Sequence, residues 1–477
     1  MIGAKSFDIN YKDFIQGVSS SDFISDGGLS PVSQCTNIWK TPGLLYGAPP
    51  VTDGTGDLTD DLIASSSYAN TNAVPIKAFV DDAGHFYSTD ATSLVLKQTD
   101  GTNPTKYKKG FTDMASFGVN GEIYTTNEKC VVRWLEGTTF DVTFFTFTTQ
   151  QNVPHPTLVY ENNLFYGDKN LLWRQTGVGV TPTLILTLSA EQTIVTLGID
   201  PGSGKMLIST TDGLNASDTI SKKARVHYYD GFSEKTLKTV VVDEMVTAFW
   251  PVGSTLFIGY GQKLGYWNGA GIQFLRTLQV TLTSTKLPYK QNFTNIDTTL
   301  FVVEGARILA FGDIIKGSPP VFYYAFTNSD VGVEADLTMI CNLGSGVLGY
   351  GWINVSTVEK FNTVDTYSVA SVGASLRLRT NKYIFERPIS FNNLVIEFGA
   401  ALPTNGSVVG IPFIFLDDQQ AIGLDGFTGI STTVANTYVV ERPYPGTPIT
   451  TRSLQISYAF SLQYPIRRMT VYYNEYD

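Results

Sequence analysis

The chain has 477 residues, of which 43% are hydrophobic, 13% aromatic and only 16% charged, and its formal net charge is −10. This acidic balance argues against a nucleic-acid groove, because phosphate binding needs clustered Lys and Arg, and the densest basic stretch, Lys106–Lys109, is short. No apolar run approaches the length of a membrane span, the first residues lack a secretory signal, and no window holds a sustained helical apolar stripe. We therefore expect an all-β protein, without membrane insertion, that is kept or assembled in a cytosol.

Residues 1–72 stand outside the pattern that the rest of the chain follows. They hold short apolar pieces in a matrix rich in Ser, Gly and Asp, and Pro42-Gly43 predicts a tight type II turn. We expect an extended N-terminal arm that packs along the following domain and donates a strand that closes it. The acidic residues near its end lack the spacing of a calcium loop, so we predict an acidic loop without a metal at Asp53, Asp57, Asp60 and Asp61.

Residues 73–373 contain a repeat. The unit is clearest in Thr255–Gly269, where a short apolar strand, a Gly-containing turn and a second strand ending in aromatics predict a half-buried hairpin. Seven copies, 37 to 49 residues apart, have first strands that begin near Phe86, Ile123, Leu164, Leu207, Leu256, Leu300 and Leu348. This period is typical of a four-stranded blade and predicts a six- or seven-bladed β-propeller. A large β-sandwich whose strands fall into a period by chance is the alternative.

Large aromatic residues recur at the end of the second strand of several units. They are Trp134, Trp173, Tyr228-Tyr229 and Tyr266-Trp267. We predict that an aromatic residue at this fixed place wedges between neighbouring blades. Two longer inserts are predicted to form loops at one rim, namely Thr211–Ala224 and Thr283–Gln291.

Residues 374–477 do not follow this repeat and have a different sequence pattern. Several runs of alternating hydrophobicity are linked by turns rich in Gly, Pro and Asn, for example Leu394–Gly399, Leu454–Phe460 and Pro465–Tyr473. This pattern predicts a small β-sandwich. The sequence thus divides into an arm (1–72), a propeller (73–373) and a sandwich-like domain (374–477).

A search for chemistry finds no catalytic, cofactor-binding or metal-binding set. The three histidines have no metal-ligand spacing, and we expect turn or surface residues at His85, His155 and His227. The three cysteines are odd in number and far apart, which predicts reduced, buried thiols at Cys35, Cys130 and Cys341. We therefore predict no catalytic, cofactor or metal residue, no cofactor, and no enzymatic activity.

Three motif-like features have simpler explanations. Pro201–Met206 lacks the first Gly and the hydroxyl residue of a phosphate-binding loop, and we predict a hairpin turn there. Ser345 lacks the two flanking glycines of a hydrolase nucleophile elbow. Adjacent carboxylates point to opposite faces of a strand unless they lie in a loop, which applies to Asp81-Asp82, Asp243-Glu244 and Asp417-Asp418.

The layout of the chain carries a resemblance to a known family. An irregular arm is followed by a propeller and then by a closing sandwich, and the short motifs involved are Asp26–Pro31, Asn37-Ile38, Thr41–Leu44 and Tyr464–Met469. In this layout the chain resembles the tail nozzle, or packaged-DNA stabilisation, proteins of short-tailed bacteriophages. It departs from that family at Lys40-Thr41, where an Arg is expected before Pro42, and in its long rim inserts.

The resemblance implies a structural virion protein of the phage tail, assembled in the host cytoplasm. Its implied partners are further copies in a ring, suspected to be a hexamer, the portal, the adaptor and other tail proteins, and packaged double-stranded DNA that passes without sequence-specific binding. A wall with few cations is compatible with DNA that passes without sticking. The alternative is a propeller-type binding module, such as a receptor- or glycan-binding tail adhesin, in which Trp173, Tyr266 or Trp267 would stack on sugars.

Overall fold

The computed structural model describes the following residues: 3–9, 35–36, 46–47, 51–53, 77–80, 86–89, 96–98, 113–119, 122–126, 130–134, 140–148, 153–212, 224–278, 288–313, 319–330, 333–334, 336–344, 346–353, 359–365, 375–402, 411–417, 422–423, 439–444, 446–447, 449–461 and 466–476. Within them, regular structure consists of β-strands and one short 3-10 helix, η1 (Lys290–Asn292). The chain forms two compact units, one of residues 1–51, 307–327 and 364–477 and the other of residues 52–306 and 328–363.

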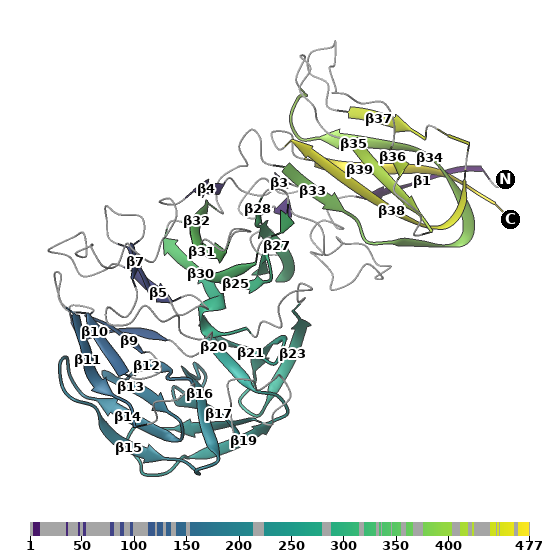
Figure 1. The fold of residues 1–477 in the computed structure, drawn as a ribbon. Coiled ribbons are helices and arrows are strands. Elements are labelled where there is room, and N and C mark those ends of the chain that lie inside the picture. The colour runs from purple at the N-terminus through teal and green to yellow at the C-terminus, as the bar shows by residue number, and fades with distance from the viewer. Residues whose placement is uncertain are drawn as a thin grey trace. The chain divides into compact units, whose positions relative to one another are not determined.

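The repeat forms a series of small antiparallel sheets (Figure 1). The first described sheet has three strands, β5 (Lys77–Val80), β6 (Phe86–Thr89) and β7 (Leu96–Gln98). Two sheets of four follow: β8 (Met114–Phe117), β9 (Glu122–Thr126), β10 (Cys130–Trp134) and β11 (Phe140–Thr146), then β12 (Thr157–Tyr160), β13 (Asn163–Asp168), β14 (Leu171–Gln175) and β15 (Thr183–Thr187).

Four more four-stranded sheets complete the series. They are β16 (Gln192–Ile199), β17 (Met206–Asp212), β18 (Ala224–Tyr229) and β19 (Lys238–Val242); β20 (Val246–Val252), β21 (Thr255–Tyr260), β22 (Lys263–Trp267) and β23 (Ile272–Thr277); β24 (Phe293–Ile296), β25 (Thr299–Glu304), β26 (Arg307–Gly312) and β27 (Val321–Thr327); and β30 (Leu337–Gly344), β31 (Val347–Ile353), β32 (Glu359–Asp365) and β4 (Val51–Asp53). The predicted hairpin at Thr255–Gly269 is β21 and β22.

The sheets close into a ring through the first strand of each. These first strands contact one another in the cyclic order β5, β8, β12, β16, β20, β24, β30 and back to β5. The prediction of a β-propeller is therefore confirmed, and the described strands supply seven blades. The seven predicted copies correspond to the second strands of these blades, from β6 to β31. β4, from the N-terminal region, is the fourth strand of the last blade, as expected for a donated closing strand.

Aromatic residues pack between neighbouring blades, as predicted from their recurrence. Trp173 of β14 lies 5.0 Å from Phe145 of β11, measured between ring centroids. Tyr229 of β18 is fully buried in one cluster with Tyr160 and Phe165 of the preceding blade. Trp267 of β22 belongs to a cluster that draws on both blade β16–β19 and blade β20–β23. Large rings suit this place because each buries 150–250 Å² (about 4–6 kcal/mol at 25 cal/mol per Å²) against two sheets at once.

One blade junction is tight enough to require glycine. A Cβ placed on Gly198 of β16 would lie 2.4 Å from the Cβ of Phe249 of β20, which is closer than real carbon atoms approach. The first strands of these two blades therefore pack backbone against side chain. Both strands are almost wholly buried along their length.

The C-terminal residues form an eight-stranded antiparallel sheet. Its strands are β1 (Gly3–Ile9), β33 (Ser375–Arg379), β34 (Tyr383–Phe398), β35 (Ile411–Leu416), β36 (Ile422–Gly423), β37 (Val439–Pro443), β38 (Thr450–Ser461) and β39 (Ile466–Glu475). β34 and β38 are long, and each pairs with the other over its first part (Figure 1). Beyond that part, β34 pairs with β37 and β39, whereas β38 pairs with β33 and β35, so the two strands join two halves of the sheet. Both halves bury one face of alternating apolar residues, such as Leu394 and Ile396 in one and Leu454 and Ile456 in the other. The described C-terminal residues are thus all-β, as expected, and the division into a sandwich-like domain stays a prediction.

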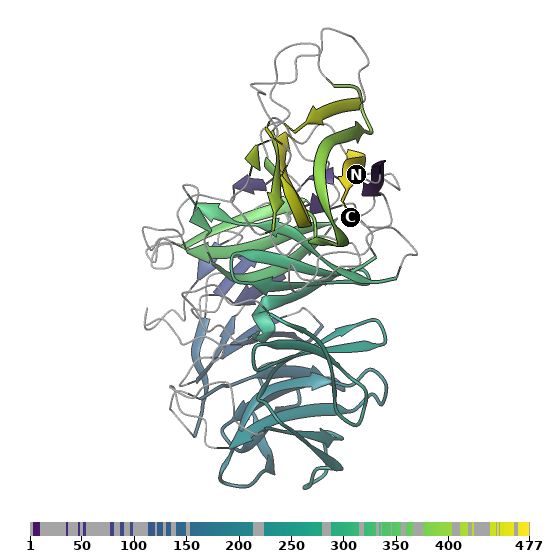
Figure 2. The ribbon, with the colours of Figure 1, turned by 90° about the vertical axis from the view of Figure 1, so that its right-hand side faces the viewer.

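The N-terminal arm does not behave as expected along its first strand. β1 pairs with β39, the last strand of the chain, so the two ends lie side by side in one sheet (Figure 2). The expectation that the arm packs along the propeller is therefore wrong for β1. β1 is paired with β39 at every position from Gly3 to Ile9, and Ile9 is fully buried. At the exposed face, Lys5 also forms an ion pair with Glu475 at 2.5 Å, and Thr470 donates a hydrogen bond to Asp8 at 2.6 Å. The predicted domain limits at 72 and 373 stay predictions.

Several predicted features lie outside the described residues. These are the Pro42-Gly43 turn, the acidic loop beyond Asp53, Asp81-Asp82, His85, Lys106–Lys109, most of both rim inserts, Ser345, Asp418 and the motifs Asp26–Pro31 and Tyr464-Pro465. Cys130 and Cys341 are buried thiols, as predicted. No helix in the described part of the chain has the length and hydropathy needed to cross a bilayer.

Candidate functional site

The alternation of antiparallel strands sorts the polar groups of the propeller into two ends. Residues that directly precede the first strand of a blade lie at one end, together with the turns that join second to third strands. The turns that join first to second and third to fourth strands lie at the other end. A group of polar side chains lies at each end, and both groups belong to the same compact unit.

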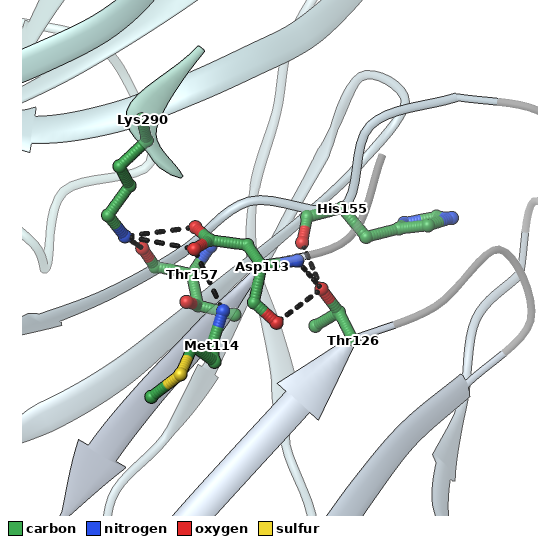
Figure 3. Close-up of polar contacts among 6 residues, drawn as sticks. All are labelled: Asp113, Met114, Thr126, His155, Thr157 and Lys290. Carbon is green, nitrogen blue, oxygen red and sulfur yellow. Dashed lines mark hydrogen bonds and ion pairs between the residues drawn. The ribbon is translucent and has the colours of Figure 1, made fainter. Parts of the chain in front are cut away.

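The first group surrounds Asp113, directly before β8 (Figure 3). Its carboxylate accepts hydrogen bonds from the backbone N–H groups of Met114 at 2.8 Å and Thr157 at 2.9 Å. The ammonium of Lys290, in η1, donates to both carboxylate oxygens at 3.1 and 3.0 Å and to the carbonyl of Thr157 at 3.3 Å. Lys290 is 177 residues away along the chain. We call these residues, with Thr126 and His155, the axial cluster.

The axial cluster continues into a buried layer around His155. The imidazole is 0% exposed, stacks on Phe147 with ring centroids 3.9 Å apart, and contacts the Gly167 carbonyl through Nδ1 at 3.0 Å. Thr126 donates to the His155 carbonyl at 2.6 Å. The carboxylate of Asp168, also fully buried, accepts a hydrogen bond from the Thr148 N–H at 2.8 Å. The groups of this end hold the first strands of neighbouring blades in register.

The second group lines a pocket of about 500 Å³ at the other end, between blades β16–β19 and β20–β23. The lining residues come from three turns and the strands beside them: Asp200, Gly202, Ser203, Tyr228, Lys238, Ser254, Leu256, Trp267, Asn268 and Gly269. The volume lies in the range of about 300–1,000 Å³ that is typical of small-molecule sites. We call this the inter-blade pocket.

Two aromatic residues form the apolar part of the inter-blade pocket. Trp267 and Tyr228 are 6% and 7% exposed, and the indole N–H donates to the Tyr228 hydroxyl at 2.6 Å. That hydroxyl donates in turn to the Gly269 carbonyl at 3.2 Å. Burial raises the pKa of Tyr228, which keeps the hydroxyl protonated at neutral pH. The aromatic pair is therefore fixed in place by its own hydrogen bonds.

The polar part of the pocket is built from two turns. Asp200 Oδ1 accepts from the Gly202 N–H at 3.1 Å and Oδ2 from the Ser203 hydroxyl at 2.7 Å, which shapes the β16–β17 hairpin. Asn268 Oδ1 accepts from the N–H groups of Ala270 at 3.0 Å and Gly271 at 2.9 Å. Since the oxygen of this amide is committed to the turn, the Nδ2 group remains to donate to a ligand.

A lysine completes the pocket. Lys238 Nζ donates to the Gly269 carbonyl at 2.9 Å and lies 5.3 Å from the centre of the Tyr228 ring. Its contacts are a backbone oxygen and an aromatic face, and no carboxylate among the described residues forms an ion pair with it. The pocket therefore presents a fixed positive charge beside an aromatic pair and a hydroxyl- and amide-bearing rim.

The structure allows several sequence predictions to be placed. Pro201–Met206 forms the β16–β17 hairpin turn, as predicted. Asp243 and Glu244 lie in the bend between β19 and β20, where Glu244 forms an ion pair with Lys263. Within the described ranges, no group of three or more His, Cys, Asp or Glu is placed to hold a metal ion. The prediction of no metal site stays a prediction.

The expectation of surface histidines is wrong for both described ones. His155 is buried, and His227 lies in β18 between the hydroxyls of Thr210 at 3.1 Å and Thr239 at 2.9 Å. Burial, with a smaller effect of the Arg225 charge, lowers the pKa of His227 to about 4. Threonine hydroxyls explain the tolerance of a neutral imidazole in a strand, because they can match either ring nitrogen. The sequence signal that could have found this is the position of His227 beside Val226, Tyr228 and Tyr229 in one strand, β18, which is buried on both faces.

Sequence reasoning did not find the inter-blade pocket. It considered Trp267 and assigned it to blade packing, which the structure confirms, but Trp267 also lines the pocket. Asp200, Ser203 and Lys238 lie on the neighbouring blade, and spacing within one repeat does not connect them with Trp267. The axial pair of Asp113 and Lys290 was missed for the same reason.

No family model and no curated protein match the chain. Among solved structures, the chain is similar to an exo-β-1,3-galactanase from Phanerochaete chrysosporium at 8% identity and TM-score 0.27, with 68% of this chain and 96% of that chain covered. It is also similar to an α-L-arabinanase from Penicillium chrysogenum at 11% identity and TM-score 0.34, with 54% and 94% covered. A third likeness, at 9% identity and TM-score 0.38, is to the extracellular domain of a putative one-component system from B. thetaiotaomicron, with 82% and 59% covered.

The expectation that the chain is not an enzyme is wrong. Two of these similar structures are named as enzymes, a galactanase and an arabinanase, so the fold gives no ground for that exclusion. The physical reason is that a propeller is a scaffold whose loops carry unrelated functions. At these identities and TM-scores, the likenesses carry no argument about what this chain binds.

Proposed function

We propose that this chain is a β-propeller binding module that holds a saccharide in the inter-blade pocket. The observation that carries the proposal is the convergence, in one pocket, of the Trp267–Tyr228 pair with Asp200, Asn268 and Lys238. A sugar has apolar C–H faces and hydroxyl edges, so it needs an aromatic surface beside fixed donors and acceptors. Pockets with an apolar lining and a few convergent polar groups are the usual small-molecule sites of proteins.

The pocket is also pre-formed. Trp267 and Tyr228 hold each other, and the side chains of Asp200 and Asn268 each fix the turn that carries them. Little side-chain ordering remains to oppose binding, because these rotamers are already set in the absence of ligand. A shallow, pre-formed site of this kind suits recognition of one or two sugar residues.

The proposal is tested with a glycan array on the purified full chain and on two matched variants. Ser254→Tyr places a ring in the pocket from the exposed turn between β20 and β21. Thr298→Tyr places the same ring in the equivalent exposed turn between β24 and β25, away from the pocket. We expect glycan binding by the wild type and by Thr298→Tyr, and its loss in Ser254→Tyr. Absence of glycan binding by the folded wild type, or equal binding by all three proteins, would refute the proposal.

A second proposed function is structural: a component of a bacteriophage tail, as the resemblance of the layout implies. The observation that favours it is the use of the N-terminal region as a double closure. β1 pairs with the last strand of the chain, and β4 supplies the outer strand of the last blade. One segment thus completes both β-domains, which suits a part that must resist mechanical load. The proposed partners are further copies in a ring, the portal and adaptor, and passing double-stranded DNA, all within the virion tail.

This second proposal is tested by mass photometry and negative-stain imaging of the purified chain. We expect a ring, suspected to be a hexamer, with a channel wide enough for duplex DNA. A stable monomer at micromolar concentration, with no incorporation into tails, would contradict it. The two proposals are compatible, because a component exposed on a tail can also carry a saccharide site.

A further inference from the structure

The inter-blade pocket holds two opposite charges in very different states. The carboxylate of Asp200 is 9% exposed, and its two oxygens accept hydrogen bonds from Gly202 and Ser203 of its own turn. The ammonium of Lys238 is on an exposed side chain and donates to a single backbone carbonyl, that of Gly269. The Asp200 carboxylate is therefore held by its own turn and lies near the Tyr228 hydroxyl, whereas the Lys238 ammonium lies on the exposed side of the pocket.

Exposed lysines are common on protein surfaces, and most are simply hydrated. Lys238 differs because its position is fixed at three points: its backbone begins β19, its Nζ atom is bonded to Gly269, and it lies over the Tyr228 ring. An ammonium group has three N–H donors, and one is used by Gly269. Two donors remain at a place that the aromatic pair already defines.

Among the residues that the structure describes, no acid forms an ion pair with this lysine. Asp200 is the one carboxylate among the residues that line the pocket, and its oxygens serve the β16–β17 turn. The chain has a net charge of −10, yet the contacts of Lys238 are a backbone carbonyl and an aromatic ring. Charge-assisted hydrogen bonds from an ammonium to a carboxylate are about twice as strong as neutral ones.

From this geometry we infer that the saccharide of the inter-blade pocket bears a carboxylate, which Lys238 binds. This inference rests on the proposed saccharide-binding function and specifies its ligand class as uronic or sialic acids. The sugar ring lies against the edges of Trp267 and Tyr228, its carboxylate accepts the two remaining N–H groups of Lys238, and its hydroxyls bond Asn268 and Ser203. The pocket should therefore bind the neutral sugar more weakly than the acidic one, because a hydroxymethyl group in place of the carboxylate leaves the Lys238 ammonium without a counter-charge.

The test compares sugars that differ only in this group. Methyl glycosides of glucose, galactose and mannose are titrated into the full chain beside the methyl glycosides of the corresponding uronic acids, with N-acetylneuraminic acid as a further acidic probe. We expect at least one acidic probe to bind tenfold or more tightly than its neutral counterpart at pH 7. The preference for the acidic sugar should shrink as the salt concentration is raised from about 0.05 M to about 0.5 M, because ions screen an exposed charge.

Two lysine variants separate recognition from general charge. Lys238→Met keeps most of the aliphatic side chain and removes the ammonium. We expect the affinity ratio of acidic to neutral sugar to fall to about one. Lys235→Met removes an exposed lysine in the same β18–β19 connection that does not line the pocket, and should leave the preference unchanged. An unchanged preference in Lys238→Met would overturn the inference.

The outcomes distinguish this inference from the function on which it rests. If neutral and acidic sugars bind the wild type equally, and Ser254→Tyr abolishes both, the saccharide function stands and the acidic class is wrong. If no sugar binds the folded wild type, both are wrong. If inorganic sulfate or phosphate alone competes as strongly as the acidic sugar, the pocket is a site for small anions, and the inference is overturned.

Discussion

Two lysines of the propeller each donate to a backbone carbonyl, but they differ in whether an acid lies beside them. Lys290, in the axial cluster, meets a carboxylate at 3.0 Å, and both partners are partly buried. Lys238, in the inter-blade pocket, meets a backbone carbonyl and an aromatic ring. This difference suggests different roles for the two charges. Lys290, which is matched by an acid from a distant blade, stabilises the fold, whereas we propose that Lys238, which is held in place by a carbonyl, binds a ligand.

The same contrast extends to the side chains around each lysine. In the axial cluster, Asp113 accepts four hydrogen bonds and joins the first strands of two blades to η1. In the pocket, the hydrogen bonds of Asp200 and Asn268 stay within their own turns, so they shape the rim without filling it. Mutations should therefore cost stability at the axial cluster and binding at the pocket. Trp267, which serves both packing and pocket, is the exception.

The largest expected effect is that of Trp267→Ala. Removing this ring leaves a cavity between two blades, and we expect a loss of about 3–5 kcal/mol in the free energy of unfolding. Urea denaturation followed by circular dichroism measures it. Trp267→Phe keeps most of the packing and removes the hydrogen bond to Tyr228, so it should lose less than half as much as Trp267→Ala. Equal losses would show that packing is not the main contribution of this residue.

The next effect is at the axial cluster. Asp113→Ala removes the acceptor of four hydrogen bonds and should cost about 2–3 kcal/mol of stability, because it leaves the backbone N–H groups of Met114 and Thr157 without their partner, and an unsatisfied part-buried donor costs about 1–3 kcal/mol. Lys290→Met should cost about 1 kcal/mol, since the lysine is partly exposed. A double-mutant cycle should give a coupling of about 1 kcal/mol between them. Strict additivity would mean that the two groups do not interact in solution.

The repeat that carries Trp267 could be predicted from the sequence, whereas the contact of Asp113 with Lys290 could not. The repeat could be predicted because each blade is a local unit, in which apolar strands and Gly-containing turns recur at a fixed period. The second strands from β6 to β31 were found in this way, and so was a closing strand donated by the N-terminal region. The pairing of Asp113 with Lys290 could not be predicted, because ring closure, and no local pattern, brings together residues 177 apart.

The same limit explains the other omissions. The pairing of β1 with β39 depends on matched register between the two ends of the chain. A sequence window of about a dozen residues cannot detect such a match. The inter-blade pocket draws Asp200 and Lys238 from one blade and Trp267 and Asn268 from the next. Each residue has an ordinary local explanation, as a turn former or a packing residue. Only their juxtaposition suggests a site.

A smaller effect concerns the pH dependence of stability at blade β16–β19. Burial lowers the pKa of His227 from an ordinary value of 6.5 to about 4, so the folded state binds this proton more weakly than the unfolded state. The neutral ring therefore contributes stability that is fully present above pH 6.5 and is lost as the pH falls through 4. His227→Gln should flatten the stability profile in this window, as measured by denaturation at a series of pH values. An unchanged slope would assign the dependence to other groups.

The smallest expected effect is that of Lys238→Met on stability. An exposed lysine with no acidic partner should contribute less than about 0.5 kcal/mol, as is usual for surface substitutions. This result, set beside the larger cost of Lys290→Met, sharpens the comparison of the two lysines, and thermal unfolding of both variants measures it. A large loss in Lys238→Met would place this residue in the fold and remove it from the site.

The central claim is that a saccharide occupies the inter-blade pocket and leaves the axial end untouched. Hydrogen–deuterium exchange of the full chain, with and without the tightest-binding methyl uronoside at millimolar concentration, tests this most directly. We expect slower amide exchange in peptides that cover the turns at residues 200–205 and 268–271, and no change at residues 113–119. Protection at residues 113–119 and 155–157 in place of the two turns, or no protection at saturation, would contradict it.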